Sequence, residues 1–200
     1  MIHSPKKLQI YYMPFCAFCQ YRFFRLWVTR SRRAEYNRYM TVKPYDRNAA
    51  VAYAKRWAYS RNPKYYDFSR IGGDCTNFAS QCIYAGAGVM NFKPLYGWFY
   101  RTASDRTPSW TGVEYLYNFL IGNDGLGPRA VEVDLDELEV GDVVQLGYAD
   151  GDFFHSPVVV EITRSQIYVA AHSIDAFGKP LSAYNAPRRR GIHITEVGAP

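Results

Sequence analysis

The order of apolar patterns along the chain constrains its fold more than any other feature. Apolar residues recur at helical spacing in three segments, and these segments precede five short apolar runs that are typical of strands. The expected helices span residues 46–59, 75–86 and 110–120, and the expected strands span 131–135, 143–146, 158–162, 167–171 and 192–197. Because the helices come first and the strands follow as a group, the sequence predicts an α+β domain with helices packed on an antiparallel sheet.

Side chains suited to helix ends support two of these helices. Asp46 precedes the first helix, where a carboxylate can accept a hydrogen bond from a free amide, and Asn62-Pro63 is expected to stop that helix. Thr111 and Glu114 have the spacing of a capping box and are expected to begin the third helix.

A cysteine at the start of the second helix is the first candidate for chemistry. Cys75 follows Gly72-Gly73, and the residues three, four, seven and eight positions after it are apolar. The first amides of a helix lack internal partners and carry the positive end of the macrodipole, so a thiol there ionises more readily and an oxyanion finds donors. The alternative is that Cys75 is a small buried hydrophobic residue, which is what the mid-helix position predicts for Cys82.

Three histidines outside the N-terminal tail are candidates for a base: His155, His172 and His193. His155 opens one expected strand and His172 closes the next, with a short turn at 163–166 between them that predicts a hairpin. In a hairpin these two positions lie at the same rim of the sheet. One imidazole could then take the thiol proton while a second group fixes its tautomer. Either histidine alone is more often a satisfied polar residue.

Ser156-Pro157 directly after His155 is unusual for a strand. A proline has no amide donor for the sheet. The strand is therefore expected either to run along an edge or to bulge at this point, which would re-aim His155.

A longer series of motifs runs in one order through the chain. They are Tyr45–Ala54, Trp57, Asn62–Phe68, Gly72–Gln81, Ser109–Thr111, Gly141–Leu146, His155 with its valine strand, Ala170–Asp175 and Ile192–Ile194. Together they resemble the bacterial putative amidase domain family, which belongs with papain-like hydrolases of the NlpC and CHAP kind. The resemblance covers roughly residues 44 to 195. It implies a papain-like fold in which the nucleophile helix packs on the sheet.

The resemblance also implies roles for particular residues. Cys75 is the expected nucleophile, His155 the general base and His172 the third polar residue. Asp175 is the alternative for the third role, because CHAP-type relatives use an acidic or amide residue there. Candidates for lining the substrate cleft are Asp74, Asn77, Trp98 and Trp110. Core packing accounts equally well for the two tryptophans.

These assignments predict a cysteine hydrolase that cuts amide bonds through a thioester, acting on a cell-wall peptide, a peptidoglycan-like amide or a related compound. Two alternatives stay open: an acyltransferase on the same scaffold, and an inactive module that binds peptide or glycan. No cofactor or metal is expected, because the chain has neither an HExxH motif nor a glycine-rich phosphate loop.

Charge separates an N-terminal extension, residues 1–43, from an expected single domain at 44–197. The extension carries nine Lys or Arg against one Glu, whereas residues 44–200 carry fifteen against seventeen acids. The domain therefore gives no argument for nucleic-acid binding. The extension has no assigned role, although contact of residues 8–33 with a membrane surface, a secretory signal, and a redox or metal role for Cys16 and Cys19 are alternatives.

The compartment is argued from the cysteines and from apolar runs. Four cysteines with no evident pairing, and no run of 18 apolar residues, favour the cytoplasm over secretion. A wall-degrading amidase would act outside the membrane, which argues the other way. The sequence leaves the oligomeric state open.

Overall fold

The computed structural model describes residues 40–200. Within this range the helices are α2 (Arg47–Trp57), α3 (Cys75–Ala87), α4 (Pro108–Thr111) and α5 (Val113–Gly122). The strands are β1 (Thr41–Lys43), β2 (Gly127–Val133), β3 (Val143–Gly147), β4 (Phe153–His155), β5 (Val158–Ile162), β6 (Ile167–Ala171), β7 (Ala176–Pro180) and β8 (Arg188–Ala199). Two short 3-10 helices, η1 (Leu135–Glu137) and η2 (Leu181–Ala183), complete the list. The predicted α+β class is confirmed.

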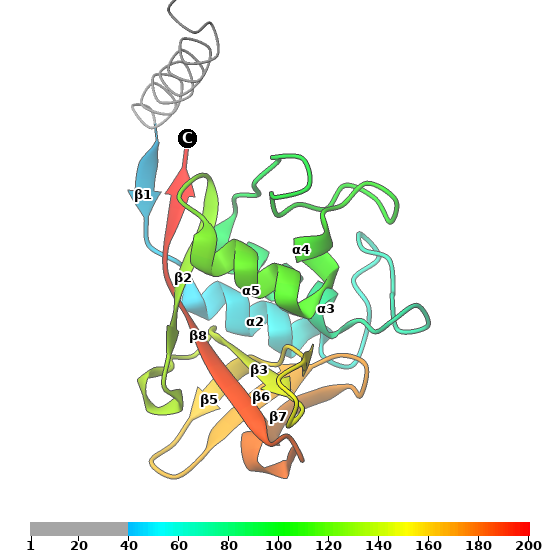
Figure 1. Cartoon of the computed structure of the whole chain (residues 1–200), viewed down its shortest axis with the longest axis vertical. Coiled ribbons are helices and arrows are strands. Elements are labelled where there is room, and N and C mark those ends of the chain that lie inside the picture. Colours follow the sequence, from blue (N-terminus) through cyan, green and yellow to red (C-terminus); the bar gives the residue numbers. More distant parts are fainter. Residues whose placement is uncertain (1–39) are drawn as a thin grey trace, which may run out of the picture. The chain divides into compact units, whose positions relative to one another are not determined.

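The sheet has the order β1-β8-β3-β5-β6-β7, with β2 added to β8 and β4 added to β3. All of these pairs are antiparallel, and Figure 1 shows the four helices grouped on one side of β3, β5 and β6. The predicted hairpin is confirmed, because β5 pairs with β6 from Val158↔Ala170 to Ile162↔Ile167. β1 pairs with the end of β8, so residues 41–43 belong to the sheet and not to the extension.

The first helix forms much as its sequence predicts. Asp46 is its N-cap and accepts a hydrogen bond of 2.9 Å from the amide of Ala49. The helix ends at Trp57, two residues before the predicted end. Ala50 and Ala54 are fully buried, so this face packs on the core.

The third predicted helix is divided in the structure. Gly112 lies between α4 and α5 in an extended conformation and serves as the cap of both. The predicted capping box is wrong, because Thr111 accepts instead from Arg106 at 3.3 Å and Glu114 accepts from Arg190 at 2.7 Å. The glycine permits the break, and the two capping side chains bond instead to nearby Arg106 and to distant Arg190.

Side chains of the central strands alternate between two cores. Val143, Val158 and Ala170 face the helices, whereas Val144, Val159 and Val169 pack in a second cluster on the other face. The second cluster is completed by Leu138, Leu146, Leu181 and Ala186. The sheet is therefore covered on both faces near the middle.

A buried carboxylate links the helices to the sheet. Asp142, fully buried before β3, accepts from Arg47 of α2 at 2.6 Å and from the amide of Ile194 in β8 at 3.0 Å. His193 Nδ1 lies 2.8 Å from the same carboxylate. The third candidate histidine thus belongs to this network.

The expectations for Cys16, Cys19 and residues 8–33 lie outside the described residues. In residues 40–200 no helix is long and apolar enough to cross a membrane. The same range contains no group of three His, Cys, Asp or Glu side chains placed to hold a metal ion.

Candidate active site

Cys75 is the first residue of α3, as predicted, and is 7% exposed. Its Sγ lies 4.0 Å from the carbonyl oxygen of Phe154 in β4 and 3.8 Å from the hydroxyl of Thr76. Gly72 and Gly73 precede the helix with φ of 89° and 106°, a backbone conformation that favours glycine. The glycine pair therefore makes the turn that brings the thiol against the end of β4.

The first turn of α3 has no side-chain cap, because Asp74 uses its carboxylate elsewhere. One oxygen accepts from the amide of Phe68 at 3.0 Å and from the side-chain amide of Asn77 at 2.8 Å. The other lies 2.6 Å from Nδ1 of His172. The amides at the start of the helix are left as donors for an anion beside Cys75.

His155 ends β4 opposite Leu146, on the face of the second core. Its ring centroid lies 5.7 Å from that of Tyr184, and no residue from 40 to 200 makes a hydrogen bond to the His155 ring. The sheet is interrupted at Ser156-Pro157, after which β5 continues between β3 and β6. Of the two predicted alternatives, an edge position is wrong for β5, which has a partner on each side, whereas the irregularity falls at Ser156-Pro157, where the strand is divided into β4 and β5.

Burial sets the protonation of both groups. It raises the pKa of the Cys75 thiol above its ordinary value, against the smaller opposing effect of hydrogen bonds from Thr76 and the backbone at Ser156. It lowers the pKa of His155 to about 4, with a further contribution from the charge of Lys179. At neutral pH the Cys75 thiol and the His155 imidazole are therefore both neutral. The helix start predicts an easily ionised thiol, but the loss of solvent around Cys75 has the opposite effect and raises the pKa.

His172 reaches the same rim of the sheet but faces the helices. Its ring is 1% exposed and stacks on Phe78 of α3 at a centroid distance of 4.0 Å. Nδ1 lies 2.6 Å from Asp74, and Nε2 lies 2.9 Å from the carbonyl oxygen of Trp57. Both ring nitrogens are therefore occupied by partners other than His155.

Asp175, the alternative third residue, lies at the surface in a two-armed ion pair. Its carboxylate accepts from the guanidinium of Arg61 at 2.9 and 3.0 Å. Between it and His172, Ser173 adopts a positive φ of 81° and accepts from the amide of Asp74 at 3.0 Å. This loop thus supports Asp74, the residue that precedes Cys75.

The other cleft candidates are interior. Trp98 and Trp110 are fully buried, with ring centroids 4.8 Å apart. The indole of Trp98 donates to Ser80 at 3.1 Å, and that of Trp110 donates to Asn77 at 2.9 Å. These tryptophans pack against α3 and present no ring at a surface.

Two residues near His155 were not singled out from the sequence. Tyr184 follows η2, and Lys179 of β7 places its Nζ 3.9 Å from the centre of the Tyr184 ring. The chain around them contains Gly178 and Pro180, which disfavour a strand prediction. Only the pairing of β7 with β6 brings this segment to the site.

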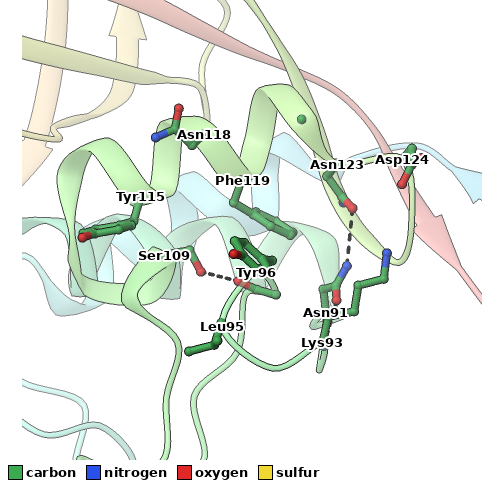
Figure 2. Close-up of a pocket in the computed structure, with 12 residues that line it drawn as sticks. Asn91, Lys93, Leu95, Tyr96, Ser109, Tyr115, Asn118, Phe119, Asn123 and Asp124 are labelled. Carbon is green, nitrogen blue, oxygen red and sulfur yellow. Dashed lines mark hydrogen bonds between the residues drawn. The ribbon is translucent and has the colours of Figure 1, made fainter. Parts of the chain in front are cut away.

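A separate pocket of about 310 Å³ lies between α5 and the loop 91–97 (Figure 2). Its lining includes neither Cys75 nor His155. Its polar side chains largely bond within the fold: Asn91 donates to Asn123 at 3.4 Å, and Ser109 donates to the carbonyl of Gly97. The pocket is therefore separate from the surroundings of Cys75 and His155.

The protein is thus an α+β domain in which a helix-start cysteine lies against a strand that ends in histidine. The family model described as a putative amidase domain matches residues 44–195, and the chain belongs to that family. Family membership indicates amide hydrolysis at a coarse level.

Two relatives come from Bacillus subtilis (strain 168). The uncharacterized protein YhbB is 40% identical over 120 residues, which cover 58% of this chain and 37% of YhbB. The uncharacterized protein YjcM is 28% identical over 152 residues, which cover 70% of this chain and 34% of YjcM. The chain thus spans about a third of the length of these relatives. No solved structure matches the chain.

Proposed function

We propose that this chain is a cysteine-dependent amide hydrolase with a papain-like arrangement of the NlpC and CHAP kind. The observation that carries the proposal is the position of the Cys75 thiol, at the uncapped start of α3 and 4.0 Å from the β4 backbone next to His155. Membership of the amidase family supports the choice of an amide as the bond that is cut.

The proposed reaction begins with both groups neutral. Sγ of Cys75 bonds to the carbonyl carbon while its proton passes to His155, and the oxyanion is stabilised by amides at the start of α3. The carbon–nitrogen bond then breaks, and His155 returns the proton to the leaving amine. Water attacks the thioester, which releases the acid and restores the thiol.

In this proposal His172 acts on the nucleophile and not on the base. It holds Asp74, the residue directly before Cys75, through a contact of 2.6 Å. The resemblance suggested that the third residue orients His155, and the alternative for that role, Asp175, pairs with Arg61. We therefore assign His172 as a positioning residue for the start of α3.

The proposed substrate is a peptide or peptidoglycan-like amide, on the strength of the family resemblance. An acyltransferase would form the same thioester but pass the acyl group to an amine or alcohol. Product analysis with added amine acceptors separates the two: free acid as the sole product supports the hydrolase.

Acylation by p-nitrophenyl acetate tests the nucleophile. The full chain should release nitrophenolate and gain an acetyl group by mass, and Cys75→Ala should abolish both. Cys82→Ala is the matched control, because it removes the other free thiol in the described residues, which is buried in mid-helix. Acetylation that is unchanged in Cys75→Ala would reject the proposal and favour an inactive binding module.

A further inference from the structure

The hydroxyl of Tyr184 is buried and has no hydrogen-bond partner in the part of the chain that the structure describes. Buried hydroxyls are nearly always paired, because an unpaired one has lost its water without compensation. An isolated donor of this kind is expected where a ligand supplies the acceptor.

The Tyr184 ring is held beside the proposed base. It lies 5.7 Å from the His155 ring, and Lys179 covers it with Nζ 3.9 Å from the ring centre. The backbone is fixed too, since the amide of Tyr184 donates to Leu181 at 3.2 Å and its carbonyl accepts from Arg189 at 3.1 Å. The hydroxyl is thus positioned before any substrate arrives.

The electrostatic surroundings keep this hydroxyl a donor. Burial raises the pKa of Tyr184, and negative charge on Cys75 raises it further. The phenol therefore stays protonated throughout a reaction at neutral pH.

We propose that Tyr184 is a further catalytic residue of the Cys75 site, whose hydroxyl donates a hydrogen bond to the substrate carbonyl oxygen as that oxygen becomes negative. The inference rests on the proposed hydrolase function. The phenol keeps its proton, so the step adds no proton transfer to the reaction. Because this donor has no protein partner, it is available to the substrate oxygen, and the hydrogen bond strengthens most as that oxygen becomes an oxyanion.

Two reagents that react with the same thiol separate this role from others. Attack on p-nitrophenyl acetate passes through an oxyanion, whereas alkylation by iodoacetamide does not. Tyr184→Phe is expected to slow acetylation by roughly 10²-fold, the effect of losing one oxyanion donor. Alkylation of Cys75 should keep its wild-type rate. Tyr115→Phe is the control, because Tyr115 is an exposed tyrosine on α5 outside the site.

Each other outcome overturns the proposal. Equal slowing with both reagents would mean that Tyr184 acts on the thiol or on the fold. Wild-type acetylation in Tyr184→Phe, with acetylation abolished in Cys75→Ala, would reject the tyrosine and leave the hydrolase standing. Acetylation unaffected by Cys75→Ala would reject both. A lower melting temperature for Tyr184→Phe would show that the hydroxyl has a partner in the folded protein, which removes the premise.

Discussion

At the scale of single residues, the acid–base character of the candidate site follows from burial. His155 is 9% exposed and has no carboxylate to stabilise its charged form among its ring contacts, so its neutral form is favoured. A base with this pKa is a weaker proton acceptor than a free imidazole, but it is unprotonated at any pH near neutrality.

This burial predicts the acid limb of the reaction. Because neutral His155 is required and its pKa is lowered from 6.5 to about 4, acetylation of Cys75 should persist as pH falls below 6.5 and be lost only near pH 4. A pH–rate profile with p-nitrophenyl acetate measures the midpoint. Circular dichroism at each pH controls for unfolding, and a midpoint near 6.5 would contradict the burial of His155.

At the scale of elements, the start of α3 is held by a chain of contacts across three segments. His172 touches Asp74 and the carbonyl of Trp57, both of which are acceptors when Asp74 is ionised. Two hydrogen bonds to acceptors require a proton on each ring nitrogen, unless Asp74 carries one of them. The contact between His172 and Asp74 is thus either an ion pair or a hydrogen bond between a neutral imidazole and a protonated carboxyl group.

Removing His172 should therefore destabilise the protein. His172→Phe removes one of the partners of the buried Asp74 carboxylate and is expected to lower the free energy of unfolding by about 3 kcal/mol. Asp175→Asn, at an exposed pair with Arg61, should cost less than about 1 kcal/mol. Urea unfolding measures both. Unchanged stability with a shifted acid limb of the reaction would instead support His172 as the residue that orients His155.

The packing of α3 on α2 depends on a glycine. A Cβ at Gly86 would overlap the ring of Tyr45 and the carbonyl oxygen of Asp46. Gly86→Ala is expected to lower the free energy of unfolding by about 2 kcal/mol through overpacking. Gly122→Ala at the end of α5, where no atom lies within 4 Å of a new Cβ, should show no loss. Equal melting temperatures for the two variants would contradict the close approach.

At the scale of residues 40–200, the Asp142 network joins the helical layer to the sheet. Arg47→Met removes the guanidinium that contacts this fully buried carboxylate and is expected to cost about 3 kcal/mol. Arg101→Met, which breaks an exposed pair with Asp105, should cost less than about 1 kcal/mol. Denaturant unfolding compares them, and similar losses would mean that the buried network adds no more than a surface pair.

Several features followed from short stretches of sequence because their causes are local. The cap at Asp46, the helix that begins at Cys75 and the bounds of β5 and β6 depend on neighbouring side chains, apolar spacing and a short turn. The sequence pattern predicts one helix across Gly112, with Thr111 and Glu114 as its capping box. Glu114 instead bonds to Arg190, and no local pattern predicts a contact with a residue so far away in sequence.

The α+β class, the helix-start cysteine and the rim position of two histidines could thus be predicted from residues 44–197, since periodicity and a tight turn specify them. Tertiary structure alone decided which way those histidines face, that His172 meets Asp74, and that Tyr184 lies beside His155. It also reversed the expected effect on the Cys75 thiol. The reason is that contacts between segments far apart in sequence, and the loss of water they cause, exist only once the sheet has closed around the site.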